Sequence, residues 1–227
     1  MTAPISVIIP VLNTADRLGP CLGVLGEALF EGLIHEVILA DGGSNDGIAD
    51  VAADVGAQLV HSPPGRGQQL AVGARAARGS WLLFLHADSV LGEDWVVAVR
   101  GHIQARPSQA GYFRLRFDSD HPMAGMVAGW ANLRSRLFGL PYGDQGLLIP
   151  KSLYARVGGF PEIPLMEDAA MARLLRGHLR PIPSVITTDA GRYEADGWFR
   201  RGARNLLTLA RYLLGTPPEK LVRSYNR

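Results

Sequence analysis

The sequence predicts an α/β fold, a Rossmann-related sandwich with a mostly parallel central sheet flanked by helices. Two observations support this. The first hundred residues alternate short aliphatic or β-branched runs with longer segments of helical periodicity. The short runs are apolar on both faces, as expected for parallel strands covered by helices on each side.

Four strands are expected in the first half, each followed by a helix of 3.6-residue periodicity. Together they give the order β-α-β-α-β-α-β-α, in which ligands gather at the carboxyl ends of the strands. The expected strands are residues 6–11, 35–40, 57–61 and 81–86.

The second half is less regular but continues the pattern. No internal repeat or low-complexity linker is present, so residues 1–227 are expected to form a single domain, with halves 1–105 and 106–227. The expected helices are residues 93–105, 123–138, 168–177 and 198–214, and the expected strands are 110–117, 146–150 and 181–187.

Composition narrows the class of protein. Of 227 residues, 47% are hydrophobic and 19% are charged, which indicates a sizeable core and excludes a disordered chain. A single cysteine, Cys21, excludes a disulfide framework and a multi-thiolate zinc site, and favours a reducing cytoplasm. No apolar run reaches the ~18 residues of a membrane span, and the N-terminus lacks a signal-peptide pattern.

The basic residues are almost all arginine. Of 23 basic side chains 21 are arginine, whose planar guanidinium binds phosphate through two hydrogen bonds, although a codon-composition bias explains the excess equally well. Aromatic residues do not interleave with them as a base-stacking platform requires, so nucleic-acid binding is disfavoured.

Polar segments follow the four expected strands of the first half. They lack G-x-G-x-x-G and G-x-x-x-x-G-K-[ST] patterns, which argues against a dinucleotide dehydrogenase and a P-loop ATPase. The segments are Pro10-Val-Leu-Asn13, Asp41-Gly-Gly-Ser44-Asn-Asp46-Gly, Pro63-Pro-Gly-Arg66-Gly67-Gln68-Gln69 and His86-Ala87-Asp88-Ser89.

His86 and Asp88 are candidate metal ligands. If the chain stays extended there, both side chains leave the strand on one face. Mg²⁺ or Mn²⁺ often binds through one or two carboxylates together with substrate phosphates and water, so Asp88 would recruit a metal–diphosphate. The alternative makes Asp88 the N-cap of a turn.

The next two candidates lie at other strand ends. Asp41 opens a turn of small residues, where its carboxylate can accept a hydrogen bond from a base or ribose, or serve the turn alone. Asp46 is expected to cap the following helix. Arg66 stands at an expected helix N-terminus, a ready site for an anion, although a solvated loop fits as well.

Asp168 follows Glu167 at the start of an expected helix. Paired acids there ordinarily cap a helix, but an ionised Asp168 can also act as a general base toward a hydroxyl group. A late cluster, Arg192, Arg200, Arg201 and Arg204 with Trp198, can neutralise a leaving diphosphate or form a solvated helix face.

These motifs together resemble glycosyltransferase family 2. The residues on which this resemblance rests are Ser6-Val-Ile-Ile-Pro10-Val-Leu-Asn13, the segments at Asp41, Arg66 and Asp88, and Met166-Glu167-Asp168. The resemblance covers nearly the whole chain. It implies a GT-A fold and inverting transfer of a sugar from a nucleotide-diphosphate donor to an acceptor hydroxyl.

The resemblance also implies roles for individual residues. Asp168 is the expected catalytic base, and Asp88 with His86 the expected site for Mn²⁺ or Mg²⁺. Two departures concern the metal: His86 replaces the first acid of the D-x-D motif, and Thr14 replaces the usual acid after Asn13. The donor site is assigned to Pro10, Asn13, Asp41, Ser44, Arg66, Ala87, Asp88 and Arg201, with Asp41 on the base.

A narrower resemblance links the chain to a small bacterial subgroup associated with arsenosugar biosynthesis. It rests on His86-Ala-Asp88, Gly143-Asp144-Gln145-Gly146, the segment from Phe160 to Asp168, and the ending from Leu214 to Tyr225. Asp144 and Gln145 would hold donor or acceptor in that case, or belong to a polar loop at a strand start.

The favoured function is a metal-dependent hexosyltransferase, expected in the cytoplasm. A sugar-nucleotide-binding protein without transferase activity and a nucleotidyltransferase are the alternatives. The acceptor is expected to be a small molecule or a lipid-linked hydroxyl. Residues 123–140 and 205–214 are amphipathic, which suits peripheral contact with the inner membrane face, but also packing against a core. The oligomeric state is left open.

Overall fold

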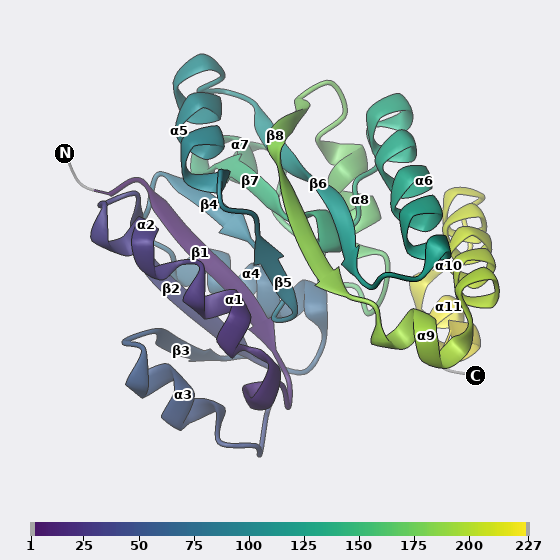
Figure 1. Cartoon of the computed structure of the whole chain (residues 1–227), viewed down its shortest axis with the longest axis horizontal. Helices are drawn as coiled ribbons and strands as arrows, with labels where there is room; N and C mark the ends of the chain where they lie inside the picture. The colour runs from purple at the N-terminus through teal and green to yellow at the C-terminus, as the bar shows by residue number, and fades with distance from the viewer. Residues whose placement is uncertain (1–2, 226–227) are drawn as a thin grey trace.

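Eight strands form one mixed sheet in the computed structural model, which describes residues 3–225 (Figure 1). The strand order is β3-β2-β1-β4-β7-β6-β8-β5. The strands are β1 (Ile5–Val11), β2 (Ile34–Asp41), β3 (Gln58–His61), β4 (Trp81–Phe84), β5 (Ser89–Leu91), β6 (Ala110–Asp118), β7 (Leu147–Pro150) and β8 (Leu179–Asp189).

Helices cover both faces of this sheet (Figure 1). Together with the sheet they form the predicted α/β sandwich. The helices are α1 (Gly19–Gly23), α2 (Gly26–Phe30), α3 (Ile48–Asp54), α4 (Arg66–Ala76), α5 (Trp95–Ala105), α6 (Pro122–Phe138), α7 (Lys151–Arg156), α8 (Glu167–Leu174), α9 (Gly191–Asp196), α10 (Trp198–Leu213) and α11 (Pro218–Tyr225), with short 3₁₀ turns η1 (Ala15–Arg17) and η2 (Gly143–Gln145).

The parallel half of the sheet is confirmed. Strand β1 pairs in parallel with both β2 and β4, and β2 pairs in parallel with β3. These four strands therefore end at the same edge. Strand β7 then pairs antiparallel with β4, so that the segment preceding β7 starts at that edge too.

Two differences from the predicted elements concern the first half. Strand β4 ends at Phe84, two residues early, because the chain turns and starts β5 at Ser89. The predicted helix after β1 is broken into η1, α1 and α2. Glycines at 19, 23 and 26 account for the breaks, since glycine is a poor helix former. Helices α7, α9 and α11 were not predicted.

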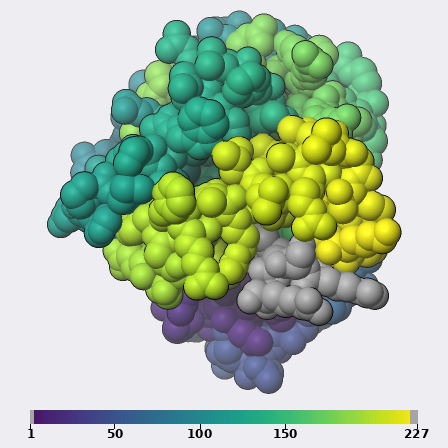
Figure 2. Space-filling view, turned by 90° about the vertical axis from the view of Figure 1, so that its right-hand side faces the viewer, coloured from purple at the N-terminus to yellow at the C-terminus, as the bar shows by residue number. Residues whose placement is uncertain are grey.

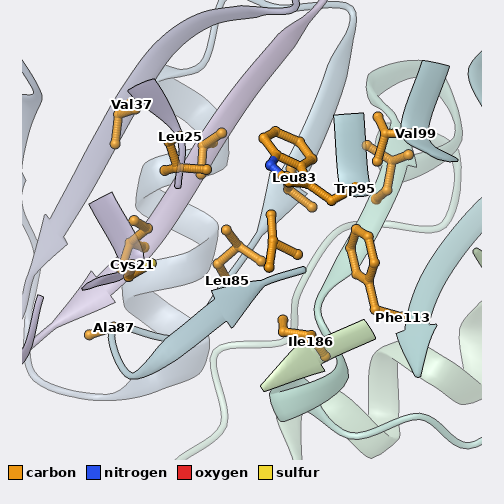
Figure 3. Close-up of a cluster of buried hydrophobic side chains, with 14 of the residues drawn as sticks. Cys21, Leu25, Val37, Leu83, Leu85, Ala87, Trp95, Val99, Phe113 and Ile186 are labelled. Atoms are coloured by element: carbon orange, nitrogen blue, oxygen red, sulfur yellow. The ribbon is translucent and has the colours of Figure 1, made fainter. Parts of the chain in front are cut away.

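The core lies on both sides of β1, whose side chains alternate between them. Val7 and Ile9 pack with residues of α1, α2 and α5, while Ile8 packs with residues of α4, α7 and α8. Figure 3 shows the first cluster, which includes Leu25, Trp95 and Leu83 of β4. Burial of these side chains holds the strand ends in fixed relative positions.

Within the described part of the chain, none of the helices combines the length and the apolar character needed to cross a bilayer.

Candidate active site

A cleft of about 530 Å³ lies at the carboxyl ends of the parallel strands. The end of β1, the start of α4, the turn after β4, the start of α8 and the inner side of α10 all contribute to its wall. Segments far apart in the sequence therefore meet there. The predicted site residues in its lining are Pro10, Arg66, His86, Ala87, Asp88, Asp168 and Arg201.

The segment carrying His86 and Asp88 is a turn. The backbone N–H of Ser89 donates to the carbonyl oxygen of His86 at 3.1 Å. The predicted extended conformation, with both side chains on one strand face, is therefore wrong. The alternative placed Asp88 at the start of a turn, and Asp88 does lie in the turn directly before β5. Both side chains nevertheless line the cleft.

Asp88 opens onto the cleft. Partial enclosure by the walls raises the pKa of its carboxyl group above the ordinary value, and the carboxylate of Asp189 acts in the same direction, while Arg66 and Arg192 oppose both. Asp88 thus lies where two arginines and a second acid converge.

His86 packs against Gly143, where a Cβ atom would lie only 2.5 Å from Nε2 of the imidazole. Burial lowers the pKa of His86 well below its ordinary value, and Arg66 and Arg192 lower it further. The imidazole is therefore neutral at physiological pH, the state in which histidine binds a metal.

Arg66 is the first residue of α4, and its Nη1 lies 3.7 Å from Oε1 of the buried Glu167. Burial raises the pKa of Glu167, with a further contribution from Asp168. The backbone at Gly67 lies so close to the carbonyl oxygen of Pro161 that a Cβ would approach it to 2.4 Å. This contact ties the start of α4 to the loop before α8.

Asp168, the second residue of α8, accepts a hydrogen bond from outside its own helix. Its Oδ2 accepts a hydrogen bond from the backbone N–H of Gly143 at 3.0 Å, and its Oδ1 accepts from Ala169 at 2.6 Å. The N-cap of α8 is Met166, which makes no side-chain cap bond. Asp168 therefore has a role beyond helix capping: it joins α8 to η2 at the cleft.

Asp41 lies beside the cleft, in a turn of its own. Its Oδ1 accepts from the backbone N–H groups of Gly43 and Ser44, and Oδ2 lies 3.3 Å from Nδ1 of His61. The turn contacts the end of β1, since the backbone N–H of Asn13 donates to Oγ of Ser44 at 2.9 Å. Asp41, Asn13 and Ser44 thus form one unit that adjoins the cleft without lining it.

Asp46 does not cap α3, so that prediction is wrong. The N-cap is Gly47, in a left-handed conformation, and Asp46 instead accepts a hydrogen bond from the backbone N–H of Ala15. The physical reason is that the loops after β1 and β2 lie side by side, so the backbone N–H of Ala15 in the first loop donates a hydrogen bond to the carboxylate of Asp46 in the second.

The late arginine cluster is divided. Arg192 and Arg201 line the cleft, and Arg201 also pairs with Asp196 at 2.6 Å. Arg204 lies 3.9 Å from the same carboxylate, while Arg200 is exposed.

Tyr142, Asp144 and Asp189 also line the cleft, and the sequence assigned no role to Tyr142 and Asp189. The Tyr142 hydroxyl group and Oδ1 of Asp144 are buried without a hydrogen-bond partner among the described residues. The guanidinium of Arg134 stacks 3.6 Å from the centre of the Tyr142 ring. For Asp189 a sequence signal existed, because it lies at the end of a strand. Residues 142–144 reach the cleft only because the strand that follows them, β7, runs antiparallel to β4.

The metal-ligating side chains of the cleft suit a divalent cation only when a substrate supplies further ligands. Among the described residues no three His, Cys, Asp or Glu side chains are grouped as a metal site. Asp88 presents an open carboxylate with the neutral His86 beside it, and Mg²⁺ or Mn²⁺ bound to a diphosphate needs only one or two protein carboxylates. The residues therefore fit a metal that enters with a diphosphate.

Similarity to known proteins points in one direction. Residues 6–134 match the model of the family described as Glycosyl transferase family 2. A PGL/p-HBAD biosynthesis glycosyltransferase of Mycobacterium tuberculosis is 39% identical over 101 residues, which is 41% of this chain and 39% of that protein. A glucosyl-3-phosphoglycerate synthase of Mycolicibacterium paratuberculosis is 30% identical over 95 residues, 38% of this chain and 29% of that protein. The aligned segment thus spans well under half of these relatives.

Solved structures share the fold. S. aureus TarS 1–349 in complex with UDP-GlcNAc superimposes with a TM-score of 0.63 at 17% identity, covering 82% of this chain and 58% of that one. Glucosyl-3-phosphoglycerate synthase of M. tuberculosis with Mn²⁺, UDP and glucosyl-3-phosphoglycerate gives a TM-score of 0.56 at 18% identity, covering 91% and 79%.

Proposed function

The chain belongs to glycosyltransferase family 2, and from this premise we propose that it is an inverting glycosyltransferase that moves a sugar from a nucleotide-diphosphate donor to an acceptor hydroxyl group. One observation carries the proposal. Asp88 and Asp168, 80 positions apart in sequence, line the same cleft. One substrate can therefore reach both a carboxylate that binds a metal, Asp88, and a carboxylate that acts as a general base, Asp168.

Asp168 acts as the general base. It removes the proton from the acceptor hydroxyl group as that oxygen attacks the anomeric carbon, and the bond to the nucleotide diphosphate breaks on the opposite side. A single displacement inverts the anomeric centre. The hydrogen bond from Gly143 to Asp168 Oδ2 fixes the carboxylate and leaves its proton-accepting capacity incompletely used, since each oxygen has two lone pairs.

The departing diphosphate is stabilised by positive charge. Arg66, Arg192 and Arg201 line the cleft and supply it directly. A Mn²⁺ or Mg²⁺ ion held by Asp88, with His86 beside it, would neutralise charge on the phosphate oxygens. The Mn²⁺-containing neighbour structure supports this metal dependence.

The donor nucleotide is assigned to the ends of β1 and β2. Pro10 and Ala87 line the adjoining wall of the cleft, while Asn13, Asp41 and Ser44 form the neighbouring turn. Asp41 is the group assigned to the base. The complexes of TarS with UDP-GlcNAc and of the M. tuberculosis synthase with UDP favour a uridine nucleotide as the first donor to test.

The same proposal extends to the whole chain. Residues 1–227 act as one unit, in which 1–105 hold the donor while 106–227 hold the acceptor and supply the base. The acceptor is a small molecule or a lipid-linked hydroxyl, and the arsenosugar link remains a prediction of the narrower resemblance. The lone, buried Cys21 fits a reducing cytoplasm.

His86 at the first D-x-D position favours one second candidate, a sugar-nucleotide-binding protein without transferase activity. Two measurements distinguish the transferase from the binding protein. Thermal shifts with UDP, GDP and dTDP, each with and without Mn²⁺, identify the nucleotide, because a ligand that binds only the folded state raises its melting temperature.

Release of free nucleotide diphosphate from the matching sugar donor, across a panel of hydroxyl acceptors, then tests transfer. Binding with no release over the panel would favour the binding protein, and pyrophosphate release from a nucleoside triphosphate would favour a nucleotidyltransferase. The proposal would be contradicted if the protein neither bound a nucleotide diphosphate nor released one from any sugar donor.

A further inference from the structure

Helix α10 is amphipathic, but its orientation is inverted. Its inward side is largely polar: Arg201 pairs with Asp196, Asn205 donates to the hydroxyl group of Tyr193, and Thr208 is buried. The apolar Trp198 and Leu209 are buried on this side as well. The opposite face carries large apolar side chains exposed to solvent. These are Phe199 (80% exposed), Leu206, Leu207 and Leu213.

Helix α6 has the same inversion. Its buried face consists of small or polar residues, including Ala124, Ala128, Ala131 and Ser135. Its outer face carries the bulky apolar side chains, with exposed fractions between 46% and 64%. These are Met126, Trp130, Leu133, Leu137 and Phe138.

The two helices lie side by side on one face of the molecule. Figure 2 views this face directly, with α6 in teal beside α10 in yellow-green to yellow. Their outer side chains, as named above, are here called the α6/α10 face. Scattered exposed apolar residues need no explanation, but a contiguous patch on one side of a soluble protein marks an interaction surface.

Charge identifies the partner. Helices α6 and α10 together contain six arginines and no aspartate or glutamate. Arg136 and Arg200 are exposed beside the apolar side chains. The acids nearest in sequence lie outside the two helices: Asp118 and Asp120, both exposed, precede α6, while Asp196, which pairs with Arg201, and Glu194, which accepts from Ser119, precede α10. An apolar face bordered by arginine, with tryptophan and phenylalanine on it, is the pattern of an interfacial helix on anionic lipid.

We propose that the α6/α10 face docks on an anionic membrane surface, with its apolar side chains in the headgroup region and Arg136 and Arg200 on lipid phosphates. A second copy of this chain fits less well. A symmetric dimer through the same face would bring the arginines of both copies together with no acid on either helix to match them.

Docking of this kind has a geometric consequence for the cleft. Arg201 and Asn205 of α10 line the cleft from the inner side of the helix, so the membrane and the cleft lie on opposite sides of one helix, whose diameter is about 10 Å. If the chain is the transferase proposed above, a hydroxyl acceptor anchored in the bilayer lies within reach of the site.

Vesicle co-sedimentation of the full chain, without donor or metal, tests the docking independently of catalysis. The vesicles are phosphatidylcholine alone, or phosphatidylcholine mixed with an equal amount of phosphatidylglycerol. The wild type is expected to bind the anionic vesicles more tightly, with binding that weakens as salt is added. Arg136→Gln with Arg200→Gln should reduce that preference.

Two apolar double variants test the face itself. Phe199→Ser with Leu207→Ser, and Trp130→Ser with Leu137→Ser, should each lower the vesicle partition coefficient by roughly 10-fold or more, because each removes two side chains that insert. The matched control is Phe30→Ser with Val97→Ser, which changes two even more exposed apolar residues on α2 and α5. It should bind as the wild type does.

Three results would overturn the proposal. One is equal binding by the face variants and the control, when circular dichroism shows that all are folded. Another is equal wild-type binding to neutral and anionic vesicles. The third is no vesicle binding together with a dimer in sedimentation analysis that the face variants dissociate, which would assign the face to a second copy.

Discussion

The backbone of Gly143 holds Asp168 in place: its N–H donates to Oδ2 of that carboxylate at 3.0 Å. The other side of Gly143 faces the imidazole of His86, with no room for a Cβ. One glycine thus sets the positions of the proposed base and of the residue beside the proposed metal ligand. Neither relationship is visible in the sequence, where the three residues are far apart.

Gly143→Ala should disturb both groups. The added Cβ would lie 2.5 Å from His86 Nε2, so the ring or the turn must shift. Since a misplacement of about 1 Å can cost ~10²-fold in rate, turnover should fall by roughly that factor. Steady-state kinetics and nucleotide binding check this. Gly101→Ala on α5, where the Cβ meets nothing within 4 Å, is the control, and equal activity of the two variants would contradict the prediction.

Asp168→Asn should separate binding from turnover. The amide keeps the size of the carboxyl group but cannot accept the acceptor's proton, so turnover should fall by ~10² or more. Donor binding should stay nearly unchanged. Isothermal titration with the nucleotide diphosphate and measurement of its release from the sugar donor give the two quantities. Wild-type turnover in this variant would remove Asp168 from the mechanism.

Asp144→Asn should stabilise the protein at alkaline pH. Burial, above all, raises the pKa of Asp144 to about 6, against the attraction of Arg134 and with help from Asp168 and Asp88. The folded state therefore holds this proton more tightly than the unfolded state, and stability falls as pH rises from about 4 to 6. A shift of two pKa units corresponds to at most ~3 kcal/mol.

The Asn variant cannot ionise, so its gain over wild type should be present at pH ~8 and absent near pH ~2.5, where Asp144 is protonated in both states. Urea unfolding at the two pH values measures the difference. A gain of the same size at both would show that the charge of Asp144 is not the cause.

Glu36→Gln should destabilise the protein, with the opposite pH dependence. Burial tends to raise the pKa of Glu36, but hydrogen bonds from Ser6 and from the backbone and side chain of Arg78 outweigh it, so the net shift is downward. The carboxylate's contribution is present above the unfolded pKa and is lost as pH falls below it.

At neutral pH the expected loss is ~1–3 kcal/mol, the typical cost of weakening bonds to a buried charged group. Thermal unfolding across the acid range checks both size and sign. Glu27→Gln, an exposed position on α2, is the control and should change little. A Glu36→Gln loss that persisted unchanged into strong acid would argue for packing instead of charge.

The sequence by itself determined the parallel half of the sheet and the edge at which chemistry gathers. The alternation of apolar runs and helical segments was enough, because strands buried on both faces have a distinctive composition. Asp88, Arg66 and Pro10 follow directly, since the ends of parallel strands share an edge. The identities of these residues and their order also carried the family resemblance, which the family model confirms.

Only the tertiary structure decided which distant groups meet and which way the helices face. Strand β7 runs antiparallel to β4, and this pairing brings Tyr142 and Asp144 to the cleft, although no local pattern encodes it. The amphipathic period of α10 was visible in the sequence, but periodicity defines two faces without saying which is buried. Packing against α9 and the cleft placed the polar face inward and left Phe199 and Leu207 outside.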